Sequence, residues 1–252
     1  MERQRNKIFD SKILWDVIVV GGGPAGMMAG GKAAEKGAKV ILIEKNETLG
    51  KKLLITGGGR CNLTNYEFDI RKLLKKFKYD GKFLFSAFSQ WSVRETLDFF
   101  NKRGMATKVE KELRVFPVSD STQSVLDVFV EYMRKHGVVV LSNSSVVEIE
   151  REGSALIGVR LKNKKIIRGR SIVIATGGIS RPETGSTGDG YLWLKNIGHT
   201  IIKPVPSLVP VAVKDLWVKR LAGVSLADIK ITVFQNNKKQ NVSKGNILFT
   251  HV

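Results

Sequence analysis

Residues 13–44 read ILWDVIVVGGGPAGMMAGGKAAEKGAKVILIE, in which two apolar runs flank a glycine turn and an Ala/Met/Lys/Glu-rich segment. The runs 13–20 and 39–44 are continuous and rich in β-branched residues, which is typical of strands buried on both faces. Gly37 closes the segment between them, because glycine readily adopts the positive φ of a helix C-terminus. This order of strand, turn, helix and strand predicts a βαβ unit and a sheet that is parallel at its start.

The glycine turn carries the spacing Gly21-x-Gly23-x-x-Gly26, which is a weak signal alone and a strong one between a strand and a helix. Gly21 permits the tight turn, Gly23 lets the backbone approach a pyrophosphate, and Gly26 allows close packing of helix on strand. Free N–H groups and the helix dipole would hold the diphosphate. Glu44 ends the second strand, where its carboxylate can accept hydrogen bonds from a ribose 2′-hydroxyl and disfavours a 2′-phosphate. The pattern predicts a dinucleotide site rather than a purely structural turn.

The composition of the 252-residue chain, 42% hydrophobic and 26% charged, excludes a disordered tail, a coiled coil and a collagen-like chain. The formal net charge of +19 favours phosphate-bearing partners such as nucleic acid, unless lysine only fills solvated faces. A single cysteine, Cys61, excludes a disulfide framework and a Cys-based zinc cluster, and we expect no metal. The charged N-terminus lacks a signal-peptide core, and no apolar run predicts a membrane span. We therefore expect a soluble cytoplasmic protein with no membrane partner.

Between residues 65 and 175 the pattern predicts three helices and five strands. Helices are expected over 70–77, after a capping box of Ser92 and Glu95, and over 125–133. The expected strands are 138–142, 145–150, 155–161, 165–168 and 171–175, with the continuously apolar last one central. Prolines and a scarcity of acids after residue 203 predict a domain boundary near 200. We therefore expect a dinucleotide-binding domain over 1–200 and the start of an incomplete β-rich domain over 201–252.

A long glycine-rich loop over residues 50–65 contains the sequence Gly57-Gly58-Gly59-Arg60-Cys61-Asn62. Three glycines permit close backbone approach, and Arg60 supplies a cation with five N–H donors. Such a loop can cradle a flavin ring and favour its anionic reduced form, the alternative being a structural turn. Arg60 also predicts a lowered pKa for the Cys61 thiol, as in a general acid or covalent partner, although packing is the commoner role of such a cysteine.

The predicted strand 171–175 opens into Thr176-Gly177-Gly178, where small residues let the backbone approach a ligand. No second glycine fingerprint lies between a strand and a helix. One dinucleotide together with the long loop suits FAD better than NAD, and an NAD-binding protein without flavin is the alternative.

Further short motifs follow in order along the chain: Arg114-Val115-Phe116-Pro117, Thr184-Gly185-Ser186-Thr187-Gly188-Asp189-Gly190-Tyr191, Leu221-Ala222-Gly223-Val224 and Leu248-Phe249-Thr250-His251. Together with residues 51–65, 175–178 and 198–210, they resemble the BaiN/RdsA-type family of NAD(P)/FAD-dependent oxidoreductases. The similarity covers nearly the whole chain from Ile13 onward, and the triple-glycine Arg-Cys-Asn motif is its most specific element.

The resemblance implies an α/β, Rossmann-like FAD domain of the glutathione-reductase type, interrupted by a β-rich inserted domain and a smaller helical domain. It implies hydride delivery from reduced flavin to an activated C=C bond, in a uridine of ribosomal RNA or a small enone, with NAD(P)H as transient electron donor. Candidate catalytic residues are Arg60, Cys61 and Asn62. Candidate cofactor-binding residues are Gly21, Gly23, Pro24, Ala25, Gly26, Glu44, Lys45, Lys52, Gly58, Gly59, Arg60, Cys61, Asn62, Val147, Ala175, Thr176 and Gly177.

Chains of that family continue past the Phe-Thr-His segment with the rest of the inserted domains, and then return to the FAD domain. We therefore expect this sequence to be the N-terminal part of such a protein, or half of a split one whose other half is a separate chain. A missing crossover strand would expose a sheet edge, so we expect weak FAD binding and low activity from this chain alone.

Several polar residues have a structural explanation as good as a functional one. His136, His199 and Asp189 lie at predicted helix ends, where capping and the helix dipole account for them. Two basic segments, 71–82 and 160–170, are more often solvated faces than tracks for a phosphate backbone, and they favour RNA as substrate only modestly. A catalytically inactive basic protein that binds RNA or a protein partner is the function of another class that the sequence leaves open.

Overall fold

The computed structural model describes residues 13–77, 81–206 and 210–250. The chain divides into two units, Met1–Ile202 and Lys203–Val252, which are considered separately. Part of the first predicted basic segment, Lys78 and Tyr79, lies outside the described residues, as does His251.

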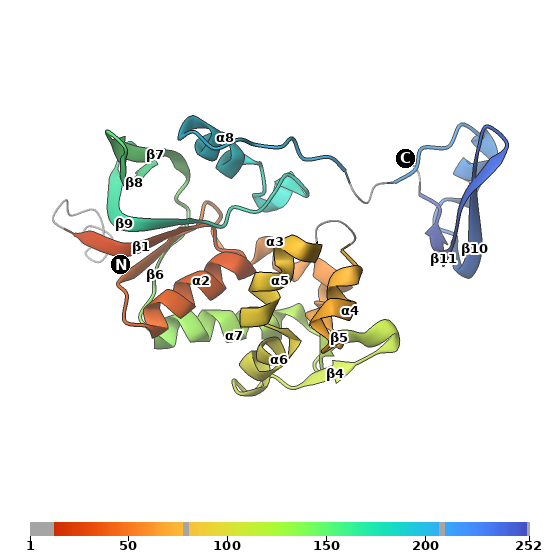
Figure 1. Cartoon of the computed structure of the whole chain (residues 1–252), viewed down its shortest axis with the longest axis horizontal. Helices are drawn as coiled ribbons and strands as arrows, with labels where there is room; N and C mark the ends of the chain where they lie inside the picture. The colour runs from red at the N-terminus through yellow and green to blue at the C-terminus, as the bar shows by residue number, and fades with distance from the viewer. Residues whose placement is uncertain (1–12, 78–80, 207–209, 251–252) are drawn as a thin grey trace. The chain divides into compact units, whose positions relative to one another are not determined.

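The first unit is built on a mixed sheet of six strands (Figure 1). Its order is β6 (Val139–Leu141), β2 (Val40–Ile43), β1 (Leu14–Val20), β9 (Ile166–Ile174), β8 (Ala155–Leu161) and β7 (Val146–Glu152). The first four strands run parallel, whereas β8 and β7 add to the sheet antiparallel. The predicted Rossmann-like α/β fold is confirmed, and the strand expected to be central lies between β1 and β8.

Both faces of β1 are buried, which explains why its sequence shows no polar alternation. On one face, Val19 packs with Met27 of helix α2 (Pro24–Glu35) and with helix α7 (Thr122–Lys135). On the other, Ile18 and Val20 pack with Trp193 of helix α8 (Asp189–Asn196). Figure 1 shows the sheet between α2 and α7 on one side and α8 on the other.

A smaller sheet and several helices complete the first unit. The sheet contains β3 (Thr64–Asn65), β5 (Arg114–Pro117) and β4 (Thr107–Val109). The predicted capping box is confirmed: Ser92 and Glu95 cap helix α6 (Val93–Asn101) reciprocally. The other elements are α3 (Lys51–Leu54), η1 (Thr56–Gly59), α4 (Ile70–Lys75), α5 (Gly81–Gln90), α6 (Val93–Asn101), η3 (Lys111–Leu113) and η4 (Pro182–Thr184).

One expectation about the strands was wrong, and one helix was not predicted. The strands predicted at 165–168 and 171–175 form one continuous strand, β9, in spite of a central glycine. Gly169 is needed there because an added Cβ would lie 2.7 Å from the side chain of Ile18 on the neighbouring strand. Helix α5 was not predicted, because its aromatic residues do not form one buried face: Phe83 and Phe85 are exposed.

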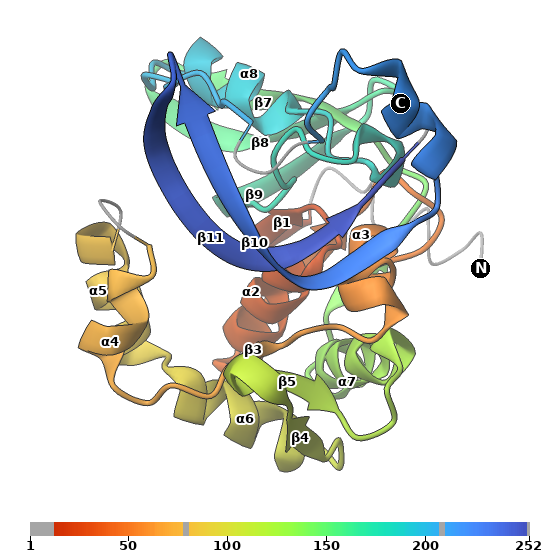
Figure 2. The same ribbon diagram turned by 90° about the vertical axis from the view of Figure 1, so that its right-hand side faces the viewer.

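The second unit contains a long antiparallel hairpin of β10 (Ser225–Gln235) and β11 (Lys238–Leu248), preceded by η5 (Leu216–Leu221) (Figure 2). The strands are joined at Asn236 and Asn237, which both have positive φ, of 51° and 57°. Asparagine tolerates this backbone region, and two such residues give the turn that matches strand twist in two-residue hairpins.

Candidate functional site

The backbone turn between β1 and α2 has no room for a side chain at two of its glycines. Gly21 has a φ of +110°, and an added Cβ would lie 2.4 Å from the carbonyl oxygen of Ala175, just past the end of β9. An added Cβ on Gly26 would lie 1.9 Å from the carbonyl oxygen of Gly21. The tight turn and the close helix packing predicted for these two residues are therefore both present.

Gly23 has open space in front of it instead. An added Cβ there would meet nothing within 4 Å. Gly23 is the N-cap of α2 without any side-chain hydrogen bond, and Pro24 begins the helix. The first-turn N–H groups of a helix have no partner inside it, so an anion at Gly23 would meet backbone donors and the positive end of the helix dipole.

Glu44 lies directly beyond β2 and is buried next to this turn. One carboxylate oxygen accepts a hydrogen bond from the backbone N–H of Gly22 at 2.6 Å. The other accepts from the backbone N–H and the side-chain amide of Asn46, at 2.8 and 2.7 Å. Three donors hold the carboxylate in one orientation, and a carboxylate has further lone pairs with which it can accept from a ligand hydroxyl.

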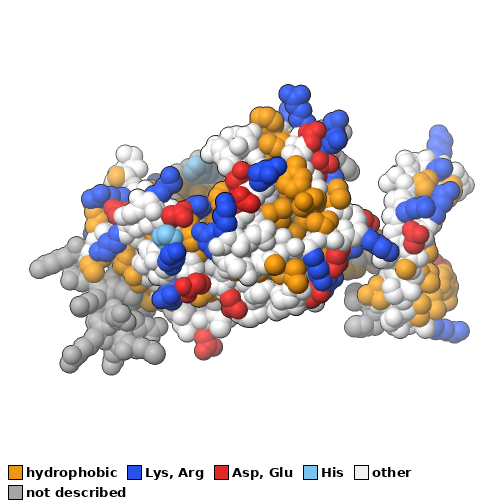
Figure 3. All heavy atoms as spheres, turned by 90° about the horizontal axis from the view of Figure 1, so that it is seen from below, with side chains coloured by type: hydrophobic (Ala, Val, Ile, Leu, Met, Phe, Trp, Pro, Cys, Tyr) orange, Lys and Arg blue, Asp and Glu red, His pale blue; other side chains and the backbone are white. Residues whose placement is uncertain are grey.

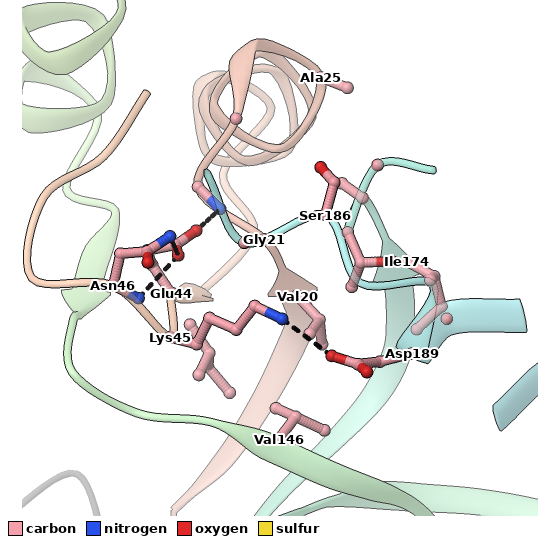
Figure 4. Close-up of a pocket in the computed structure, with 18 of the residues that line it drawn as sticks. Val20, Gly21, Ala25, Glu44, Lys45, Asn46, Val146, Ile174, Ser186 and Asp189 are labelled. Carbon is pink, nitrogen blue, oxygen red and sulfur yellow. Dashed lines mark hydrogen bonds and ion pairs between the residues drawn. The ribbon is translucent and has the colours of Figure 1, made fainter. Parts of the chain in front are cut away.

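A cavity of about 510 Å³ lies along the carboxyl ends of β1, β2 and β9. Figure 4 shows its lining, with Gly21 and Ala25 on the α2 side and Ile174, Ser186 and Asp189 opposite. The chain reverses its direction across the sheet at β1, and ligands of open α/β sheets bind in the crevice at such a point. The position and size of the cavity suit an elongated ligand.

The segment 180–189 accepts hydrogen bonds from three side chains, those of Lys45 and Asn46 after β2 and of Lys52 in α3. Lys45 donates to Asp189 at 2.9 Å (Figure 4). It also donates to Thr187 at 2.7 Å. Asn46 donates to the carbonyl oxygen of Thr184, and Lys52 donates to that of Ser180. Burial opposes ionisation of Asp189, but the hydrogen bonds and charge from Lys45 outweigh it, and the pKa of this carboxyl lies below its ordinary value.

The cavity brings together most of the predicted cofactor-binding residues. Those that line it are Gly21, Gly23, Pro24, Ala25, Glu44, Lys45, Lys52, Ala175, Thr176 and Gly177. Those that do not are Gly26, Gly58, Gly59, Arg60, Cys61, Asn62 and Val147, although Val146, the neighbour of Val147, does. Sequence reasoning missed Asn46, Ser144, Ser186 and Tyr191 as lining residues. For Asp189 the sequence left two explanations open, stabilisation of a helix N-terminus and contact with a ligand, and the residue lines the cavity.

The predicted flavin loop has its own backbone signature. Gly57, Gly58 and Gly59 have φ of 56°, 66° and 86°, a run of left-handed conformations that only glycine adopts without strain. Added Cβ atoms on Gly58 and Gly59 would meet nothing within 4 Å. The loop therefore presents an open strip of backbone, as a surface that a planar ring could approach.

Arg60 is not the free cation that the sequence suggested. Its guanidinium donates hydrogen bonds to Glu110 and Asp120 and lies over the Phe116 ring, 4.3 Å from the centroid. Lys108 pairs with Asp120 in the same cluster. The carboxylates of Glu110 and Asp120 therefore compensate the charges of Arg60 and Lys108. Through its hydrogen bonds to these carboxylates, Arg60 anchors the glycine loop to the β4–β5 hairpin. This pairing contradicts the expectation that Arg60 offers a free positive charge to an anionic flavin.

The prediction of an activated Cys61 thiol was wrong. Cys61 is buried in the core cluster that contains Met27 and Val19, and burial raises the pKa of its thiol, opposed only in part by a hydrogen bond with Thr56. The Arg60 guanidinium pairs with Glu110 and Asp120 instead of with this thiol. The neighbouring Asn62 amide donates to the carbonyl oxygens of Thr64 and Val115, so it too serves the loop.

Residues 15–248 match the family model described as the HI0933-like protein Rossmann domain. The chain belongs to the HI0933-like family. A ribosomal RNA dihydrouridine synthase from Escherichia coli is 30% identical to this HI0933-like chain over 94% of it and 57% of the relative. A 3-dehydro-bile acid delta(4,6)-reductase from Clostridium scindens is 32% identical over 82% of the chain and 49% of the relative. The HI0933-like chain thus spans about half the length of the curated relatives it matches.

Solved structures share the fold of the HI0933-like chain at lower identity. A flavocytochrome c3 fumarate reductase aligns with 90% of this chain and 50% of its own, at a TM-score of 0.59 and 21% identity. A 3-ketosteroid-delta4-(5alpha)-dehydrogenase from Rhodococcus jostii aligns with 77% of this chain and 56% of its own, at 0.57 and 17%. Among the described residues, no helix is long and apolar enough to cross a membrane.

Proposed function

We propose that this chain binds FAD and forms the cofactor domain of an oxidoreductase that reduces an activated C=C bond. The observation that carries the proposal is the Glu44 carboxylate, fixed by Gly22 and Asn46 at the wall of a cavity that also contains Gly23. The ribose of an adenosine diphosphate group would bind at Glu44, and its pyrophosphate at Gly23 and the start of α2. The negative charge of Glu44 disfavours a 2′-phosphate at that position.

Two features favour FAD over NAD alone. Thr176 and Gly177 line the cavity together with Ala175, and the loop glycines Gly58 and Gly59, which do not line it, have open space at which a ring system could approach their backbone. FAD, when bound, supplies hydride transfer to an acceptor. The role of Arg60 and Asn62 in this proposal is to hold the glycine loop in position. Arg60 fixes the loop by its hydrogen bond to Asp120, and Asn62 ties it to β5. Cys61, buried with a raised pKa, is not a covalent partner in this proposal.

The proposed acceptor is an activated alkene, with a uridine in ribosomal RNA ahead of a small enone. The names of two relatives support this chemistry, because dihydrouridine is uridine with its C=C bond saturated and the bile acid reductase is named for double-bond positions. The formal charge of +19 favours the RNA acceptor. NAD(P)H is the proposed electron donor, since the sequence has one dinucleotide fingerprint and FAD would occupy it.

A titration of the purified chain with FAD tests the proposal, with the absorbance spectrum and the mass of the released cofactor as readouts. Glu44→Gln should weaken FAD binding by roughly 10- to 100-fold, because its amide would face the Asn46 donors and lose the charge-assisted bond to the ribose. Glu47→Gln is the matched control, an exposed carboxylate three residues away. A chain that binds NAD but no flavin, or salt-sensitive RNA but no flavin, would contradict the proposal.

A further inference from the structure

Helices α4 and α5 pack against each other and expose a group of basic and aromatic side chains. We call this group the α4–α5 patch. All of its members are exposed and none lines the cavity described above. The α4–α5 patch consists of Arg71, Lys72 and Lys75 from α4, and of Lys82, Phe83 and Phe85 from α5.

The positive charge of the patch is not compensated by ion pairs. Within residues 13–77, 81–206 and 210–250, none of its four cations lies within ion-pair distance of a carboxylate. The nearest acids along the described sequence, Glu67 and Asp69, accept hydrogen bonds from backbone N–H groups at the start of α4. As far as the described residues go, the four cations are therefore available to an outside anion.

The other basic segment of the sequence, 160–170, is different. Arg160 pairs with Glu150 and Glu148, Arg168 lies 3.7 Å from Glu152, and Arg170 lies 3.4 Å from Asp16. Cations and carboxylates are likewise interspersed over the face shown in Figure 3. The three arginines of that segment therefore lie beside carboxylates, whereas the four cations of the α4–α5 patch have no ion pair with a carboxylate of the described residues.

The aromatic members of the patch add a second kind of contact. Phe83 is 88% exposed, so nearly its whole ring is open to solvent, and Phe85 is 48% exposed. Unstacked bases stack on such rings whatever their sequence, while neighbouring cations hold the phosphates. A duplex keeps its bases stacked and offers no face to these rings. This combination fits a single strand better than a helix of nucleic acid.

We propose that the α4–α5 patch is a binding surface for single-stranded RNA. The proposal rests on the RNA acceptor named under the proposed function, and it assigns to that acceptor a contact surface outside the cofactor cavity. The cations of α4 would follow the phosphate backbone, and Phe83 would stack on a base.

The test measures binding of a short fluorescein-labelled oligouridine to the full chain, by fluorescence anisotropy over a series of KCl concentrations. The triple variant Arg71→Gln/Lys72→Gln/Lys75→Gln should weaken binding at least about tenfold and reduce the salt slope by about 2, at about 0.7 per phosphate contact. The matched control, Arg160→Gln/Arg168→Gln/Arg170→Gln, removes the same charge from three cations that lie within ion-pair distance of carboxylates and should change both quantities much less.

Phe83→Ala should weaken binding by between about five- and a hundredfold without changing the salt slope, because stacking is not ionic. Phe234→Ala, which removes a 63% exposed ring from the second unit, is its control. Equal losses in the patch and control triples, an unchanged affinity in all variants, or a shift of Phe83→Ala from dimer to monomer with unchanged RNA affinity would each overturn the proposal. FAD titration of the same variants should be unchanged, which separates this outcome from failure of the cofactor proposal.

Discussion

Lys45 and Asp189 lie 144 residues apart in sequence, and the ammonium of one is 2.9 Å from a carboxylate oxygen of the other. The pair joins the end of β2 to the start of α8, and both of its members line the cavity. Thr187 hydrogen-bonds to both partners. A contact of this kind ties together two chain segments that a ligand in the cavity would touch.

Asp189→Asn should accelerate FAD release several-fold while leaving the fold intact, because it removes the charge that holds Lys45 across the cavity. An ion pair this exposed contributes only about 1 kcal/mol or less, so a larger loss is not expected. Stopped-flow flavin fluorescence gives the release rate. Glu183→Gln, an exposed carboxylate 3.7 Å from Arg181, is the control, and equal rates in the two variants would contradict the role given to Asp189.

Gly26→Ala and Gly23→Ala should separate folding from cofactor binding. The first places a Cβ 1.9 Å from a backbone oxygen and should cost about 1–3 kcal/mol of unfolding free energy. The second meets nothing within 4 Å, so the apoprotein should keep its stability and lose FAD affinity. Urea denaturation and FAD titration measure the two effects. If Gly23→Ala bound FAD like the wild type, close backbone approach at that residue would be wrong.

Glu110 and Asp120 should govern stability at acid pH. Hydrogen bonds from Arg60 lower the pKa of Glu110, and those from Lys108 and then Arg60 lower that of Asp120. Because both folded pKa values lie below the unfolded ones of about 4, the stabilisation is present above that pH and is lost as the pH falls through the folded values. Thermal melts of Glu110→Gln/Asp120→Asn should show lower stability at neutral pH and a flatter acid limb than melts of Glu47→Gln. An unchanged acid limb would argue against the anchoring role of Arg60.

Cys61 should react slowly with iodoacetamide in the native chain and rapidly once the chain is unfolded in urea. The thiolate is the reactive form, and burial both shields the thiol and raises its pKa. Mass spectrometry of the alkylated chain at increasing pH follows the reaction. Rapid native alkylation at neutral pH would restore the catalytic interpretation of this residue.

The features that the sequence predicted correctly are local ones. Gly21 and Gly26 are explained by the strand–turn–helix pattern that contains them, and the capping box of Ser92 and Glu95 spans a single helical turn. The continuous apolar run of β1 correctly predicted a strand that is buried on both faces of the sheet. Each of these depends on residues close together in the chain, so periodicity and spacing are sufficient to find them.

The features that were missed depend on distant partners. Nothing near Arg60 in sequence indicates Glu110 and Asp120, which compensate its charge. The expectation for Cys61 failed because the thiol is buried in the core. Likewise, the ion pair of Lys45 with Asp189 exists only once β2 and α8 meet. Charge compensation is a tertiary property, and a single sequence does not reveal which cations remain free.

The close contact between the carbonyl oxygen of Ala175 and Gly21 affects the order in which the site forms during synthesis. The first βαβ unit emerges early in synthesis with its glycine turn and Glu44, but Ala175 and β9 follow only after most of the unit has been translated. A nascent chain therefore holds half a cofactor site until β9 inserts beside β1. Uptake of the cofactor would then report completion of the sheet, and ligand binding would select finished domains from unfinished ones.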